Sequence, residues 1–259
     1  MPIRTITDNN WRDFQPQNGI VERKVVYGSP EARALGMVPI EDTLDVLIPW
    51  DDMEERINEA NAKRQMPIHH LEAANHLAHN QGGTNYCWAY GITTCLEALR
   101  IMENQPYKRL GPSSMGWLVD WRNRGNYLSD AMRGVWERGV ASAEFCGDAT
   151  YDRRSFKAGW EDDALNHKLH EWTDANPDGG DELMAQQCCS LLVGGLPLYE
   201  AFNWWGHALA RVGVVWDTNE MYNLRWIDWN SHNDGRIEMT GSKGIPDEAY
   251  APRVATFSI

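Results

Sequence analysis

The chain has 259 residues, with 37 acidic against 24 basic side chains and a net charge of −13 at neutral pH. Because no run of lysine or arginine forms a basic patch, we do not expect nucleic acid as a partner. The length allows one large domain or two lobes that share a cleft. No stretch has the length of a signal-peptide core or a membrane span, so we expect no membrane partner and synthesis in the cytoplasm. Five cysteines, an odd number, fit a reducing compartment.

Residues 1–75 are expected to form an N-terminal extension. Up to about residue 40 the pattern predicts an extended, partly stranded arm with breaks at Gly28-Ser29-Pro30 and Val38-Pro39. A polar helix then starts near Pro49, with acidic residues in its first turn. The extension can be an inhibitory pro-segment, a docking arm or packing for the rest of the chain. We favour the docking arm.

The segment from Gln81 to Tyr90 carries the strongest chemical signal. Cys87 is predicted to open a helix, where the partial positive charge of the helix N-terminus favours the thiolate. The side-chain amide of Gln81 and the backbone N–H of Cys87 can together stabilise an oxyanion. The alternative interpretation is a buried cysteine at the start of an ordinary core helix.

The sequence pattern in the middle of the chain predicts two helices and a strand. Residues from Phe156 to Asp174 read as one helix with Trp160, Leu165, Leu169 and Trp172 on one stripe, ended by Asn176-Pro177-Asp178-Gly179-Gly180. A second helix is expected from Asp181 to Leu192. The residues from Gly194 to Phe202 then predict the first strand of a sheet.

Two residues far from Cys87 complete a constellation. His207 stands where a loop becomes a strand rich in small and β-branched residues. After a turn at residues 217–220, a second strand ends at Asn230-Ser231. This hairpin can bring Asn230 beside His207, so that Asn230 fixes the imidazole tautomer while the other ring nitrogen faces Cys87.

These motifs resemble those of papain-like cysteine peptidases. The family pattern is matched, in order, by Gln81, Cys87-Trp88, His207-Ala208 and Asn230-Ser231. The resemblance implies a two-lobed α+β fold over residues 76–259, with a helical lobe to about 190 and a β-rich lobe from about 191. It also implies hydrolysis of peptide bonds in a peptide or protein substrate by a Cys87, His207 and Asn230 triad assisted by Gln81, without a cofactor.

Two positions depart from the family pattern. Thr84 replaces a cysteine that forms a disulfide in secreted members, and His232 replaces a tryptophan that covers the asparagine. Without that indole we expect a wetter and weaker bond between Asn230 and His207, and lower activity. Nearby Trp226 and Trp229 are candidates to substitute for it.

The resemblance also suggests substrate contacts. The segment Leu110–Asp120 resembles a helix that follows a leucine-serine start in the family, and Gly125-Asn126-Tyr127 with the helical run to Gly139-Val140 resembles the segment that shapes the non-primed subsites. We therefore take the substrate-binding candidates to be Trp88, Trp117, Tyr127 and Trp205. For most of the thirteen tryptophans, core packing is the simpler interpretation, and Trp205 is the best exception.

A narrower resemblance concerns origin. The phrases Gly83–Trp88, Phe202–Ala208 and Ala251–Ala255 are similar to papain-like proteins of tailed bacteriophages and prophages. This implies synthesis in a bacterial host and association with the virion, with other virion proteins bound through the N-terminal arm. The alternative functions are a virion structural or adaptor protein with a vestigial or assembly-only site and, less favoured, a cell-wall amidase.

Histidine pairs invite a metal hypothesis. His69-His70 lie near His76 and His79 in the sequence, and His167 and His170 can share a helix face. Neither set has cysteine or carboxylate partners in a recognised ligand pattern. We therefore expect no metal site.

Overall fold

The computed structural model describes residues 3–14, 16–43, 47–232 and 235–254. Within them the α-helices are α1 (Pro30–Ala34), α2 (Trp50–Ala62), α3 (Pro67–Ala73), α4 (Cys87–Met102), α5 (Leu128–Arg138), α6 (Trp160–Ala164) and α7 (Gly180–Val193). The strands are β1 (Arg4–Ile6), β2 (Met37–Pro39), β3 (Glu171–Asp174), β4 (Leu198–Phe202), β5 (His207–Trp216), β6 (Leu224–Asn230), β7 (Gly235–Met239) and β8 (Glu248–Arg253). The longest 3-10 helix is η3 (Pro112–Val119). Within the described ranges, no helix is long and apolar enough to cross a membrane.

One eight-stranded sheet organises the molecule. Its strand order is β1-β7-β6-β5-β4-β8-β3-β2, and the four central pairs from β7 to β8 are antiparallel. Strands β1 and β2 lie at opposite edges and pair in parallel with β7 and β3. Both edges of the sheet therefore come from the N-terminal extension, which is built into the fold.

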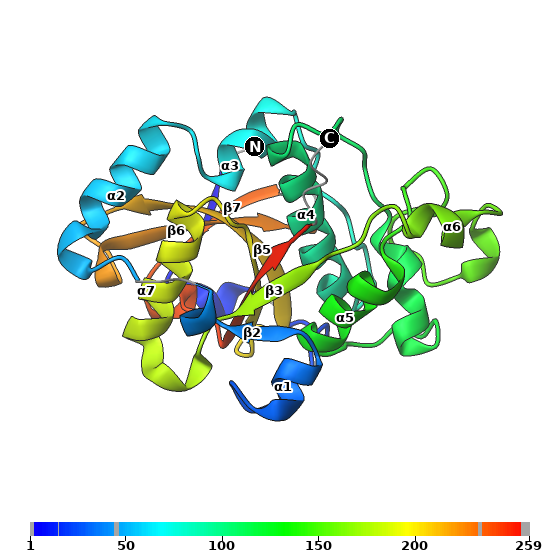
Figure 1. Cartoon of the computed structure of the whole chain (residues 1–259), viewed down its shortest axis with the longest axis horizontal. Helices are drawn as coiled ribbons and strands as arrows, with labels where there is room; N and C mark the ends of the chain where they lie inside the picture. The colour runs from blue at the N-terminus through cyan, green and yellow to red at the C-terminus, as the bar shows by residue number, and fades with distance from the viewer. Residues whose placement is uncertain (1–2, 15, 44–46, 233–234, 255–259) are drawn as a thin grey trace.

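Helix α4 packs against the middle of this sheet, and Figure 1 shows it between α2 and α7 on one side and α5 and α6 on the other. Every residue from Cys87 to Leu99 is buried, so protein surrounds the first three turns of α4 on all faces. The approach is close: a Cβ atom on Gly91 would lie 3.1 Å from the carbonyl oxygen of Leu209. The sheet thus fixes where the first residue of α4 lies.

The sequence-based expectations differ from the structure at two places. The break expected at Val38-Pro39 lies inside β2, because these residues pair in parallel with Thr173 and Asp174 of β3. The other difference is in the middle segment. The α+β class, the helix at 181–192, the strand that starts at His207 and the hairpin to Asn230 are confirmed. The single helix from Phe156 to Asp174 is wrong. It is replaced by α6 and β3, because β3 fills the gap between β2 and β8 and buries Trp172 there. Pairing with distant strands overrides the helical spacing of the apolar residues.

A buried arginine holds the centre of the sheet together. The Nε atom of Arg211 lies 3.0 Å from Asp228 and 3.1 Å from Glu200, and all three side chains are fully buried. Its Nη2 donates to the carbonyl of Gly244 at 2.8 Å, and the guanidinium lies 4.2 Å from the ring centre of Trp226. Burial raises the pKa of Glu200. The positive charge of Arg211 opposes this rise, and the negative charge of Asp228 adds to it. One cation therefore serves two carboxyl groups.

We predict that Arg211→Met destabilises the protein strongly. It leaves two buried carboxyl groups without a counter-ion, and removal of one partner from such a cluster costs about 3–5 kcal/mol. Urea denaturation followed by circular dichroism measures the change. As a control, Arg154→Met removes an exposed pair with Asp152 and should leave the urea midpoint unchanged. A wild-type midpoint for Arg211→Met would contradict the role of this cluster.

Candidate active site

Cys87 is the first residue of α4, as expected. Its thiol is fully buried, and the backbone N–H of Ala208 donates to Sγ at 3.3 Å. Because Ala208 follows His207 in β5, this contact places the histidine next to the cysteine. The tertiary structure therefore brings together two residues separated by much of the chain.

His207 and Asn230 form the expected pair. The Nε2 atom of His207 lies 2.9 Å from Oδ1 of Asn230, which also accepts the N–H of Ser231. Since Oδ1 only accepts, Nε2 carries the hydrogen in the neutral ring. The other ring nitrogen, Nδ1, is buried and has no hydrogen-bond partner among the described residues. Its lone pair is available to take a proton.

Two rings enclose the imidazole of His207. The ring centre of Trp205 lies 4.5 Å from that of His207. The ring of His232 stacks on the His207 ring, with 5.3 Å between ring centres and an interplanar angle of 24°. His207 and Asn230 are both buried. The expectation of a wetter bond is therefore wrong for this conformation, in which the ring of His232 stacks on that of His207. The expected lower activity stays a prediction.

The two tryptophans proposed as substitutes have other contacts. Trp226 packs against the guanidinium of Arg211, and Trp229 lies 5.7 Å from the ring centre of His76. The cover over the histidine is thus supplied by the residue that departs from the family pattern.

Gln81 links the two sides of the site. Its Oε1 accepts from the hydroxyl of Ser231 at 2.7 Å, and its Nε2 donates to the carbonyl of Thr84 at 2.9 Å. The side chain of Thr84 in turn donates to the Gln81 carbonyl, so hydrogen bonds fix this loop. An amide nitrogen has two hydrogens, so Nε2 keeps one for an oxyanion.

Residues 17–21 of the N-terminal arm run across the thiol, a feature that the sequence did not reveal. On one side, the N–H groups of Gln17 and Gly19 donate to the carbonyls of Trp205 and Gly206, at 2.6 and 3.1 Å. On the other side, residues 19–21 exchange backbone hydrogen bonds with Asn126. The arm thus crosses the site between the loop before β5 and the segment that contains Asn126.

Glycine permits this close contact at two positions. A Cβ atom on Gly19 would lie 2.1 Å from Sγ of Cys87, which no side chain tolerates. Gly206 has φ +63°, and its Cβ atom would lie 2.0 Å from the carbonyl oxygen of Gln17. Only a residue without a side chain fits either place.

The arm is anchored on both sides of the thiol. Before the crossing, β1 pairs with β7 and Asp8 accepts hydrogen bonds from Ser242 and Lys243. After it, the guanidinium of Arg23 binds both oxygens of Asp174, at 2.7 and 2.6 Å. Such bidentate pairs are among the stronger polar contacts in proteins.

The covered site is uncharged. Burial raises the pKa of Cys87 to about 12, although backbone N–H groups, led by that of Ala208, oppose the shift. Burial also lowers the pKa of His207 to about 3, against the effect of its bond to Asn230. In this conformation desolvation therefore outweighs the thiolate-stabilising effect of the helix N-terminus that the sequence suggested.

The four substrate-binding candidates lie in different surroundings. Trp205 lines a cavity of about 520 Å³ together with Asn230 and His232. The ring of Tyr127 contacts the ammonium group of Lys24 in the arm, at 4.7 Å. Trp88 is fully buried in the core. Trp117 lines a cavity of about 210 Å³ in which none of the catalytic candidates takes part.

Comparison with known proteins supports the fold. No family profile and no curated sequence matches the chain. Among solved structures, xylellain, a cysteine protease from Xylella fastidiosa, is 18% identical with a TM-score of 0.53, over 69% of this chain and 83% of its own. Digestive procathepsin L2 from Tenebrio molitor larval midgut is 15% identical with a TM-score of 0.57, over 96% and 81%. Both are papain-like cysteine proteases.

The fold is two-lobed and papain-like. Procathepsin L 3 from the same beetle gives a similar result, with 14% identity and a TM-score of 0.55 over 93% of this chain. At these identities the similarity establishes the papain-like fold. The chemistry has to be argued from the residues themselves.

We predict that Gly19→Leu exposes Cys87. The added side chain cannot coexist with Sγ, so the arm has to leave and water has to enter, which lowers the pKa of the thiol. Since each unit of pKa raises the thiolate fraction about tenfold, alkylation by iodoacetamide at pH 7 should accelerate at least ~10-fold. Mass spectrometry of the peptide that contains Cys87 measures the rate.

Gly147→Ala is the matched control, because a Cβ atom at that glycine meets no other group within 4 Å. Its alkylation rate should equal that of the wild type. An equally slow rate in Gly19→Leu would show that the arm does not limit access to the thiol.

Proposed function

We propose that this protein is a cysteine peptidase of the papain-like type, with Cys87 as nucleophile. The observation that supports this most directly is the His207–Asn230 pair held against the N-terminus of α4. The asparagine fixes the tautomer in which the free nitrogen of the histidine can accept the proton of the thiol.

The residues allow a complete acyl transfer. His207 Nδ1 accepts the thiol proton, and the thiolate of Cys87 attacks the peptide carbonyl carbon. The free hydrogen on Gln81 Nε2 and the backbone N–H of Cys87, which lies in the first helical turn, stabilise the oxyanion. His207 then protonates the leaving amine, and water attacks the thioester to release the acid and restore the thiol. No step requires a metal or cofactor.

We further propose that the conformation described is a latent one. A substrate carbonyl has to reach Cys87 Sγ, and Gly19 occupies that position. Residue Ile20 forms a parallel bridge with Asn126, one of the residues expected to shape the cleft. These contacts favour the inhibitory pro-segment over the docking arm among the roles considered for the extension. The extension as a means of binding other virion proteins stays a prediction.

The substrate is proposed to be a peptide or protein that replaces the arm in the cleft. Trp205 and Tyr127 are the substrate-binding candidates that lie where such a chain would pass, since both border residues of the arm. Phe14 packs edge-on against Trp205 at 5.7 Å, which shows that this indole accepts an aromatic side chain.

One alternative has a specific observation in its favour. The covered and uncharged thiol suits a papain-fold virion structural or adaptor protein that does not hydrolyse peptides. The bacteriophage origin rests on sequence phrases alone and stays a prediction. A cell-wall amidase has no observation in this structure to favour it.

We predict that Gly19→Leu cleaves a denatured protein substrate and that Cys87→Ala in the same background does not. Loss of the general base in His207→Ala should lower kcat/KM by about 10²–10⁴-fold. Loss of one oxyanion donor in Gln81→Ala should lower kcat by up to about 10²–10³-fold. Release of fluorescent peptides measures each rate.

Cys95→Ala is the control, since this buried cysteine lies two turns further along α4 and contacts no reacting group. It should retain activity and labelling by an E-64-type epoxide. If folded Gly19→Leu neither cleaves any peptide pool nor reacts with the epoxide, the peptidase proposal is wrong and the structural alternative stands.

A further inference from the structure

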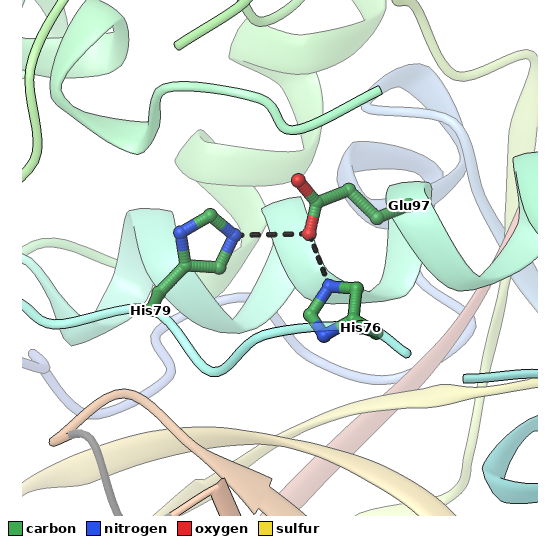
Figure 2. A group of neighbouring side chains, drawn as sticks. All are labelled: His76, His79 and Glu97. Carbon is green, nitrogen blue, oxygen red and sulfur yellow. Dashed lines mark hydrogen bonds and ion pairs between the residues drawn. The ribbon is translucent and has the colours of Figure 1, made fainter. Parts of the chain in front are cut away.

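A second polar cluster lies in the core, apart from the cysteine site. His76 and His79 follow α3, and Glu97 lies in α4 (Figure 2). The side chains of all three are fully buried. The mechanism proposed above uses none of them.

The two imidazoles converge on one carboxylate oxygen. The Nε2 atoms of His76 and His79 lie 2.5 and 2.9 Å from the same Oε2 of Glu97, as Figure 2 shows. The other oxygen of Glu97 accepts the backbone N–H of Leu110 at 2.6 Å, which fixes the carboxylate plane. One atom from each residue therefore lies within 4.8 Å of the other two.

Hydrogen bonds within the described residues leave this cluster incomplete. With both Nε2 atoms donating to Glu97, the Nδ1 atoms of His76 and His79 are buried without a hydrogen-bond partner. Nδ1 of His79 faces Oδ1 of Asp148 at 3.7 Å, and the two form an ion pair only when His79 is protonated. Nδ1 of His76 has no such neighbour, and a buried polar atom without a partner is costly.

We propose that His76 Nε2, His79 Nε2 and Glu97 Oε2 bind one divalent transition-metal ion, Zn²⁺ being the best match to two imidazoles and a carboxylate. Bonds of about 2.0–2.1 Å in a tetrahedral arrangement separate neighbouring ligand atoms by about 3.3 Å. The two short contacts to Glu97 have to open by less than about 1 Å to admit the ion. Water can take the fourth position.

Metal binding also allows Nδ1 of His79 to donate a hydrogen bond. Coordination through Nε2 moves the ring hydrogen to Nδ1, which faces Oδ1 of Asp148 at 3.7 Å. A ligating histidine that donates its second nitrogen to a carboxylate is the usual outer arrangement of metal sites. Glu97 supplies one negative charge to the ion, whereas Asp148 is already paired with Arg109 at 2.8 Å.

The site is structural. The side chains of His76, His79 and Glu97 are fully buried, so no substrate can reach the ion. The rings of Tyr107 and Trp229 pack against His76 at 5.3 and 5.7 Å. Its ligands join the segment before Gln81 to the helix that begins with Cys87. The ion would therefore fix the loop that supplies the oxyanion donor.

A proton is the competing occupant. Burial opposes a charge on His79, but the Glu97 carboxylate outweighs it and raises the pKa of His79 to about 9. A protonated His79 can hold the same three side chains together without a metal, and the experiment has to separate these two occupants.

The test uses the full-length protein, stripped with EDTA and then titrated with Zn²⁺ or Co²⁺. Elemental analysis after desalting should give one metal per chain, and Co²⁺ should show the visible absorption of nitrogen and oxygen coordination. At a Zn²⁺ concentration 100-fold above Kd, Tm should rise by at least about 5 °C.

Glu97→Gln keeps the shape of the ligand and removes its charge, so metal binding should weaken at least ~10-fold. The double variant His69→Gln/His70→Gln is the matched control and should bind as the wild type does, because those residues lie outside the cluster. If Glu97→Gln does not fold, the wild-type titration decides.

Three results would overturn the proposal. The first is a stripped wild type that binds no metal and keeps its Tm, which would leave the proton as the occupant. The second is undiminished binding by Glu97→Gln. The third is a thiolate-to-cobalt charge-transfer band, which would place the ion on a cysteine.

Discussion

The packing of α4 against the centre of the sheet is the constraint on which the site depends. Residues Cys87 to Leu99 of α4 are all buried, and the sheet, α3, α5 and η3 cover them. Once α4 is fixed, its first residue lies against the start of β5. The thiol and the histidine therefore meet because two buried elements share one contact, the N–H of Ala208 to Sγ.

Desolvation explains why Cys87 and His207 are both uncharged in this conformation. A thiolate and an imidazolium both need solvent or a substrate dipole, and residues 17–21 supply neither to Cys87. The arm satisfies its own backbone groups with the cleft walls at Trp205, Gly206 and Asn126, so covering the site leaves few polar groups unpaired. The proposed latency and the proposed catalytic geometry are thus compatible in one structure.

The extension differs from a simple appendage because it also builds the sheet. Strands β1 and β2 close opposite edges, and Arg23 pairs with the buried Asp174. Uncovering Cys87 therefore requires only the crossing residues between these anchors to move. Exposed sheet edges favour unwanted pairing, so β1 and β2 are expected to stay in place when the crossing opens.

The sequence by itself determined the candidate catalytic residues and the elements that carry them. Cys87 at a helix start, His207 at a strand start and Asn230 at the end of the next strand are set by local patterns within a few residues. The tertiary structure alone decided three other features. They are the strand at 171–174, the glycine over the thiol and Glu97 between two histidines. Each depends on contacts between residues distant in the chain, which local periodicity does not encode.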